Sequence, residues 1–234
     1  MKIELWSDFA CPFCYMGKKR FEQALAAFEN RDEVEVSYKA YQLDPNAPKK
    51  MEGTAAEAFA RGHGMDVKQA EERFRMFTEN ARTVGLTYNY DIIQMTNTFD
   101  AHRLAKWADT KGLEPEITDR FMKAYFSEGK NLSDFETLAT LASEVGLDRN
   151  EALEVLNKND YADEVKAQID EGHRVGVQGV PFFVINRKYG VSGAQQKEYF
   201  LAALKQVHDE EKELKVLNEE QDEDASCEGD ACGI

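Results

Sequence analysis

The residues best suited to chemistry in this sequence are its four cysteines, which stand in two close pairs. Cys11 and Cys14 are separated by Pro12 and Phe13, whereas Cys227 and Cys232 lie in an acidic stretch near residue 234. A thiolate can attack a disulfide sulfur, and a second thiol nearby can then resolve the mixed disulfide. The first pair therefore indicates dithiol–disulfide exchange, with half a zinc site or two buried apolar side chains as alternatives.

The elements that would position the first pair are a strand and a helix. Residues 3–6 are mostly apolar and are predicted to form a strand, and a helical pattern runs from Pro12 to about Glu29. Residues 34–40 alternate as a second strand would. Because a helix N-terminus favours negative charge, this βαβ arrangement would stabilise a thiolate on Cys11.

The rest of the chain divides by its periodicity. Residues from about 54 to 174 are almost wholly helical in pattern, strand character returns at residues 182–185 and 189–191, and a last helix is predicted over residues 194–217. The predicted fold class is α/β, a small βαβ … ββα domain interrupted by a large all-helical insertion. We predict that residues 1–46 and 175–217 form the two parts of that domain, with residues 47–174 as the insertion and residues 218–234 as an acidic tail.

Composition excludes several classes of function. The 234 residues carry a formal net charge of −15, which disfavours non-specific binding to nucleic acid or to an anionic membrane surface. Eleven acidic and two basic residues fall within residues 209–234, so much of the acidity belongs to the tail. No secretory signal and no transmembrane run are recognisable, and we expect a cytoplasmic location. Cytosolic disulfides are mostly transient and catalytic, which agrees with a redox role for paired cysteines.

A second motif, Gly179-Val180-Pro181 before an apolar run, gives the chain a resemblance to the thioredoxin superfamily. Members have a Cys-Pro-x-Cys motif after the first strand and a cis-proline facing the redox pair. The resemblance implies that Pro181 is cis, which X-Pro bonds tolerate. It also implies that the backbone of Val180 would offer strand-like hydrogen bonds to an extended substrate.

The large helical insertion makes the chain resemble the DsbA-type branch and, within it, the FrnE-like thiol oxidoreductases. The resemblance covers roughly residues 1–215 and is carried by residues 6–14 (WSDFACPFC), Asn97-Thr98 with residues 101–104 (AHRL), and residues 176–183 (GVQGVPFF). It implies a protein disulfide oxidoreductase or isomerase with Cys11 and Cys14 as catalytic residues. Its substrates would be protein or peptide disulfides, with a thioredoxin-like or low-molecular-weight thiol as reductant and no cofactor.

The second cysteine pair allows three interpretations. FrnE-like proteins also have a C-terminal C-x-x-x-x-C pair, so Cys227 and Cys232 are predicted to be an accessory redox pair that exchanges with Cys11 and Cys14. The alternatives are an acidic tail with incidental cysteines and a four-thiolate metal site shared with the first pair. No histidine cluster has metal-ligand spacing, and no metal is expected.

Two other functions remain open at this stage. The same architecture is shared by glutathione-dependent enzymes, the kappa-class transferases and the hydroxychromene-carboxylate isomerases, which usually have Ser at the nucleophile position and lack the second cysteine. A non-enzymatic DsbA-like adaptor is the other alternative. Among single residues, His102 is expected either in the core or beside a substrate groove. Asp8 is expected to have a loop or cap role or to assist proton transfer.

One departure from the family pattern predicts the redox potential. The best-known DsbA proteins have His immediately before the second cysteine, where this chain has Phe13. Without a cationic or donating side chain, the reduced form is less favoured. We predict a potential nearer to the about −270 mV of thioredoxin than to the about −120 mV of DsbA. Equilibration of the Cys11–Cys14 pair in glutathione buffers measures it, and a value above about −150 mV would contradict the prediction.

Overall fold

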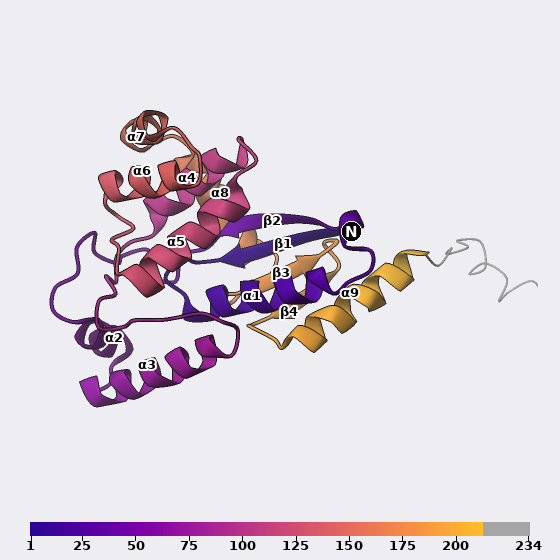
Figure 1. The fold of residues 1–234 in the computed structure, drawn as a ribbon, viewed down its shortest axis with the longest axis horizontal. Helices are drawn as coiled ribbons and strands as arrows, with labels where there is room; N and C mark the ends of the chain where they lie inside the picture. Colours follow the sequence, from indigo (N-terminus) through magenta and orange to yellow (C-terminus); the bar gives the residue numbers. More distant parts are fainter. Residues whose placement is uncertain (213–234) are drawn as a thin grey trace, which may run out of the picture.

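A four-stranded mixed sheet stands at the centre of the computed structural model, which describes residues 1–212 (Figure 1). The strands lie in the order β2-β1-β3-β4. They are β1 (Lys2–Ser7), β2 (Glu35–Ala40), β3 (Phe182–Ile185) and β4 (Tyr189–Ser192). β1 runs parallel to β2 and antiparallel to β3, and β3 runs antiparallel to β4. A parallel pair requires a crossover connection. Helix α1 (Pro12–Ala26) and a short 3-10 helix, η1 (Arg31–Glu33), supply it.

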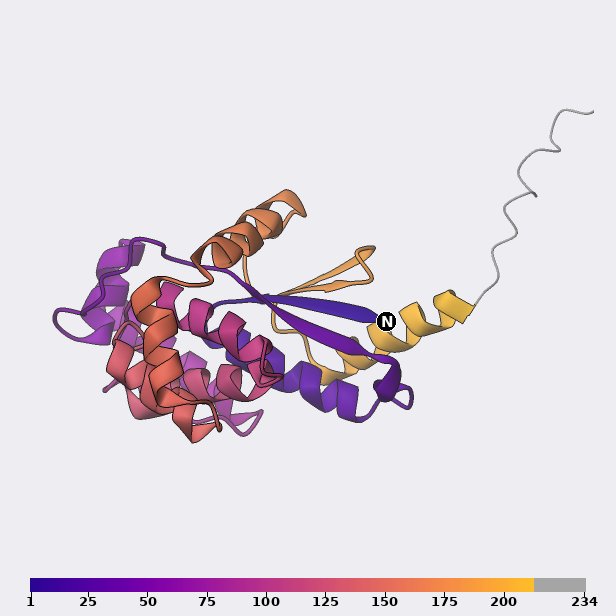
Figure 2. The same ribbon diagram turned by 90° about the horizontal axis from the view of Figure 1, so that it is seen from above.

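Alternation along the strands sends side chains to two different cores. Ile3 and Leu5 of β1, with Phe183 and Ile185 of β3, face α1 and α9 (Lys197–Lys212). Trp6 points to the other face, where its indole nitrogen donates to the Gln168 carbonyl of α8 (Ala162–Arg174) at 3.0 Å. Figure 2 shows α8 on one side of the sheet and α1 and α9 on the other. The sheet is therefore covered on both faces, as its apolar strands require.

The remaining helices form a layer beside one end of the sheet (Figure 1). They are α2 (Ala55–His63), α3 (Val67–Arg82), α4 (Phe99–Asp109), α5 (Glu114–Glu128), α6 (Phe135–Glu144) and α7 (Arg149–Lys158). Several start at side-chain caps, with complete capping boxes at Thr54 and Asp66. The largest apolar cluster of the described residues lies within this layer and includes Cys11 and Cys14. The redox motif is thus enclosed partly by helices from the middle of the chain.

The predicted fold is confirmed: it is a thioredoxin-like α/β domain with a large helical insertion between β2 and β3. Some details differ from the prediction. α1 ends at Ala26 rather than near Glu29, because the backbone N–H of Ala27 and Phe28 close a tighter turn. α9 starts at Lys197 rather than at residue 194, because Gly193, at φ 80°, lies in a bend that precedes the helix. Cys227, Cys232 and the predicted end of the last helix lie outside the described residues. Within residues 1–212, no helix is both long and apolar enough to cross a membrane.

Candidate active site

Cys11 is the N-cap of α1, and its sulfur takes the place of the oxygen that usually caps a helix. The backbone of Cys11 is extended, and Pro12 occupies the first turn, where a missing N–H is tolerated. The Cys11 sulfur accepts a hydrogen bond from the backbone N–H of Cys14 at 3.3 Å. The N–H of Cys11 donates to the carbonyl of Asp8 at 3.1 Å, which fixes the approach to the helix. The hydrogen bond from the Cys14 N–H, like the helix dipole, favours negative charge on the Cys11 sulfur.

Cys14 lies behind Cys11, in the first turn of the helix, and is fully buried. Both are free thiols. Burial raises the pKa of the Cys14 thiol well above its ordinary value, and the neighbouring Cys11 raises it further. The backbone N–H of Asp8, 3.5 Å from the Cys14 sulfur, and the hydroxyl of Ser7 act in the opposite direction. Cys14 is therefore suited to remain a thiol until the charge on Cys11 is removed.

The loop before β3 faces the cysteine pair. The peptide bond between Val180 and Pro181 is cis, as the resemblance implied. The Cys11 thiol donates to the Val180 carbonyl at 3.5 Å, so the predicted substrate-binding residues lie beside the predicted nucleophile. Pro181 packs closely on α1: a Cβ added to Gly17 would lie 2.9 Å from the Cγ of Pro181. The carbonyl of Pro181 also accepts from the N–H of Gly193 at 2.8 Å.

Asp8 anchors the loop between β1 and α1. Its carboxylate accepts from the N–H of Leu43 at 2.7 Å, the hydroxyl of Thr98 at 2.8 Å and the N–H of Ala10 at 3.3 Å. His102 is buried beside it, with Nε2 3.7 Å from Asp8 Oδ1 and its ring 4.5 Å from that of Phe9. The structure thus gives Asp8 a loop-anchoring role and gives His102 a place in the core.

The helix expected to start at Asn97-Thr98 is α4, but its start differs from a simple side-chain cap. Thr98 is the N-cap, yet its hydroxyl bonds to Asp8 rather than to the helix. The Asn97 side chain instead accepts from the N–H of Phe99 at 2.9 Å. The motif that carried part of the resemblance therefore ties α4 to the redox loop.

The residues around Cys11 and Cys14 differ in how far their side chains are exposed to solvent. The Phe13 side chain is 41% exposed and contacts Phe77 of α3 edge-to-face, with ring centroids 5.2 Å apart. Cys11 itself is only 2% exposed, and Val180 is half-buried. The surface next to Cys11 is accordingly apolar.

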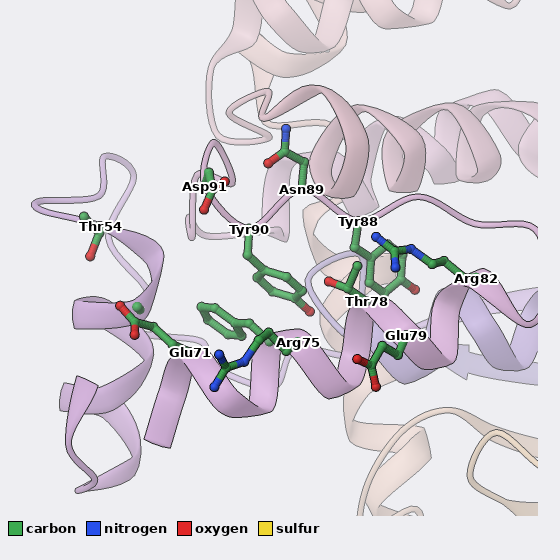
Figure 3. Close-up of a pocket in the computed structure, with 12 residues that line it drawn as sticks. Thr54, Glu71, Arg75, Thr78, Glu79, Arg82, Tyr88, Asn89, Tyr90 and Asp91 are labelled. Atoms are coloured by element: carbon green, nitrogen blue, oxygen red, sulfur yellow. The ribbon is translucent and has the colours of Figure 1, made fainter. Parts of the chain in front are cut away.

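A cavity of about 630 Å³ lies between α3, the start of α2 and residues 88–91 (Figure 3). Tyr88 and Tyr90 project into it from the segment before α4, facing Arg75, Glu79 and Arg82 on α3. The Tyr88 hydroxyl donates to the carbonyl of Pro12 at 2.7 Å. Burial and the nearby Cys11 raise the pKa of both tyrosines above the ordinary value. Tyr88 thus connects the wall of this cavity to the first turn of α1.

Sequence reasoning did not single out Ser7 or Tyr88 as contacts of the redox motif. Ser7 belongs to residues 6–14, which carry the family resemblance, but nothing in the sequence distinguishes it there. Tyr88 lies 76 residues from its partner Pro12 in the sequence. Cys227 and Cys232, the predicted accessory pair, lie outside the described residues. Within residues 1–212, no group of three or more His, Cys, Asp or Glu side chains is arranged to hold a metal ion.

Comparison with known proteins places this geometry in context. A family model described as "DSBA-like thioredoxin domain" matches residues 2–205. The structure of a probable DsbA oxidoreductase from Streptomyces coelicolor is 39% identical, with 100% of this chain and 99% of the other covered and a TM-score of 0.86.

Two more distant structures show the fold alone. The first is 2-hydroxychromene-2-carboxylate isomerase, at 15% identity, coverage of 90% of this chain and 98% of the other, and a TM-score of 0.66. The second is the cytosolic disulfide reductase DsbM from Pseudomonas aeruginosa, solved with GSH, at 14% identity, coverage of 89% and 100%, and a TM-score of 0.63.

The close packing at Gly17 generates a prediction about the site. In Gly17→Ala, the new Cβ would meet the ring of Pro181 and, at 3.3 Å, the backbone of Ala194. We predict a loss of about 1–3 kcal/mol in the free energy of unfolding, because the proline ring and the backbone cannot yield easily. We also predict slower reaction of Cys11 with a model disulfide. Urea unfolding and a stopped-flow thiol assay measure the two effects.

The matched control is Gly62→Ala, in α2, where an added Cβ has no neighbour within 4 Å. This substitution should leave the Cys11 reaction unchanged and raise stability by up to about 1 kcal/mol, as expected in a helix without a clash. Equal stability changes in the two variants would contradict the packing account.

Proposed function

The chain belongs to the family of DSBA-like thioredoxin domains, and on that premise we propose that it is a protein dithiol–disulfide oxidoreductase, working as a reductase or isomerase. The observation that carries the proposal is the juxtaposition of three groups. Cys11 caps α1, Cys14 lies behind it in the same turn, and the Val180 carbonyl and Pro181 face the Cys11 sulfur.

The first step of the proposed reaction is attack by Cys11. Its thiolate attacks one sulfur of a substrate disulfide, a new bond forms to Cys11, and the other substrate sulfur leaves as a thiolate. An extended substrate segment would pair with the backbone at Val180, in the manner of an added strand. The exposed ring of Phe13 and the half-buried Val180 would contact apolar side chains near the disulfide.

The second step depends on Cys14. Formation of the mixed disulfide removes the charge on Cys11 and with it one cause of the raised pKa of Cys14. The Cys14 thiolate then attacks the Cys11 sulfur, the bond to the substrate breaks, and the substrate leaves with two more electrons than it brought as a disulfide. The oxidised Cys11–Cys14 pair is reduced again by an external thiol.

Reduction or isomerisation is favoured over net oxidation by the residue between the cysteines. Phe13 supplies no hydrogen bond or positive charge to a thiolate, so the reduced pair has less extra stabilisation than a histidine would give. A reducing cytosol would keep such a pair in the dithiol form. We propose a cytoplasmic location on this basis, and DsbM, of the same fold, is named as a cytosolic disulfide reductase.

The proposed partners are protein or peptide disulfides and a thiol reductant, either thioredoxin-like or of low molecular weight. The GSH in the DsbM structure supports the second kind of reductant. The finer assignment to the FrnE-like branch, and exchange between the first pair and Cys227 with Cys232, are part of the proposal.

The glutathione-dependent isomerase reading is less favoured. The fold is common to that class, since 2-hydroxychromene-2-carboxylate isomerase is a structural neighbour. Enzymes of that class usually have Ser at the nucleophile position and no second cysteine, whereas this chain has a buried resolving thiol directly behind the first. That thiol has a role in disulfide exchange and none in the glutathione-dependent isomerisation of a small molecule.

Reduction of insulin disulfides with a thiol reductant tests the proposal. Cys11→Ser should lower turnover more than 100-fold, because the nucleophile is removed. Cys14→Ser should retain the attack and accumulate a mixed disulfide on Cys11, detectable by mass spectrometry. Cys227→Ser combined with Cys232→Ser should slow turnover only, through loss of the proposed exchange.

Three outcomes would count against the proposal. Full activity of Cys11→Ser would remove Cys11 from the reaction. Retention of a cellular binding function by Cys11→Ser, without disulfide reduction by the wild type, would support an adaptor instead. Unchanged kinetics in the double tail variant would defeat the exchange between the two pairs.

A further inference from the structure

The peptide group between Pro12 and Phe13 is the first in α1 that carries an N–H, and it follows directly on the capping residue, Cys11. Backbone N–H groups in the first turn of a helix point out of its N-terminal end, where the Cys11 sulfur forms the cap. Within residues 1–212, the Phe13 N–H donates to no backbone carbonyl. This donor is therefore available to a charged Cys11 sulfur.

A buried hydroxyl from a distant part of the chain donates to the carbonyl of the same peptide group. The Tyr88 hydroxyl lies 2.7 Å from the Pro12 oxygen. Tyr88 is only 4% exposed, and its ring stacks on those of Phe126 and Tyr15, with centroids 4.4 and 6.3 Å away. Burial raises the pKa of Tyr88, so the hydroxyl keeps its proton at the pH values where thiols titrate. Tyr88 is thus a fixed donor to the start of α1.

Hydrogen bonds at the two ends of one peptide group reinforce each other. A donor at the carbonyl oxygen draws electron density from the amide nitrogen, and the N–H becomes a stronger donor in turn. Such cooperative strengthening is about 10–30% per bond. It matters most where the acceptor is charged, because charge-assisted hydrogen bonds are roughly twice as strong as neutral ones.

We propose that the Tyr88 hydroxyl stabilises the Cys11 thiolate through the Pro12–Phe13 peptide group, by strengthening the Phe13 N–H as a donor to the charged sulfur. The inference rests on the function proposed above and adds Tyr88 to it as a positioning residue. It involves no covalent step and no proton transfer. In a chain with Phe13 before the second cysteine, this contact supplies thiolate stabilisation from outside the redox motif.

The titratable side chains around Cys11 come from three segments: Asp8 in the preceding loop, Cys14 in α1, and Tyr88 and Tyr90 before α4. Burial is the largest cause of the raised pKa of both tyrosines, and the charge of a Cys11 thiolate contributes to each. The Tyr90 hydroxyl is buried but has no hydrogen-bond partner. Tyr90 therefore matches Tyr88 in chemistry and neighbourhood, and it differs in lacking the bond to the backbone of α1.

The test follows alkylation of Cys11 by iodoacetamide across pH, in the full chain with Cys227 and Cys232 changed to Ser. Mass spectrometry of the Cys11 peptide gives the rate at each pH, and hence the pKa of the thiol and the rate constant of its thiolate. In Tyr88→Phe, the acid dissociation constant of Cys11 should fall about two- to fourfold, because the peptide group is less polarised. The aromatic ring remains, so its stacking on Phe126 is retained.

The shape of the pH profile separates this effect from a loss of packing. A less stabilised thiolate is a stronger nucleophile. The rate constant of Tyr88→Phe at high pH should therefore rise by up to about twofold, while the rate below the pKa of Cys11 falls by up to about twofold. A loosened helix start that merely exposes Cys11 would raise the rate at every pH. That result, or an unchanged profile, would overturn the inference.

Two further variants complete the test. Tyr90→Phe is the matched control, and it should leave the pKa and the rates of Cys11 unchanged, because the hydroxyl that it removes has no partner. Tyr88→meta-fluorotyrosine keeps the hydroxyl and makes it a more acidic and hence stronger donor, so the acid dissociation constant of Cys11 should rise. A fall in this variant, or an equal shift in Tyr88→Phe and Tyr90→Phe, would also overturn the inference.

The outcomes distinguish the inference from the proposed function, since alkylation needs no disulfide substrate. The expected shift in Tyr88→Phe, in a protein that does not reduce insulin, would support the inference and contradict the proposed function. Normal reduction of insulin by the wild type, with an unchanged Cys11 profile in Tyr88→Phe, would contradict the inference alone.

Discussion

Cys11 caps helix α1 with a sulfur atom, accepting the N–H of Cys14 where most helices present an oxygen. This contact requires an extended residue at the end of the β1–α1 loop and a helix that starts immediately after it. It also sets the second cysteine on the inner side of the first turn. A thiolate at this position interacts with free N–H groups at the helix end, while the thiol behind it is enclosed by the core.

The surrounding elements hold that helix start in place from three directions. Asp8 fixes the loop before it through bonds to Leu43 and Thr98, so the segment after β2 and the N-cap of α4 both contribute. Tyr88 holds the carbonyl of Pro12 from the segment after α3. Pro181 packs on Gly17 from the loop before β3. The helical insertion is therefore part of the site, since it encloses Cys14 and supplies groups that contact the first turn.

Burial gives the two cysteines different chemistry, although only two residues separate them. The Cys14 thiol is disfavoured as a thiolate by burial and by the adjacent Cys11, and it gains reactivity only once Cys11 carries a substrate. The Cys14 thiol therefore stays protonated while Cys11 attacks the substrate, and it reacts only with the mixed disulfide that results.

The sequence allowed the redox pair, its place at a helix start and the interrupted α/β fold to be predicted, because local periodicity and a strand–helix boundary carry that information. The cis bond before Pro181 followed only from the family resemblance. Contacts between distant segments could not be predicted: Thr98 reaches Asp8 across 90 residues, and Tyr88 reaches Pro12 across 76. The helical periodicity of the sequence also did not distinguish α8 from the other helices of the insertion, although α8 covers one face of the sheet.

The central claim is that Cys11 is the nucleophile and Cys14 the enclosed resolving thiol. Brief alkylation of the reduced, folded protein with iodoacetamide at neutral pH, followed by peptide mass spectrometry, tests it most directly. The account predicts that Cys11 is modified at least 100-fold faster than Cys14, and that Cys14 reacts at the rate of an ordinary thiol only after unfolding. Modification of Cys14 before Cys11, or equal rates for the two in the folded protein, would contradict it.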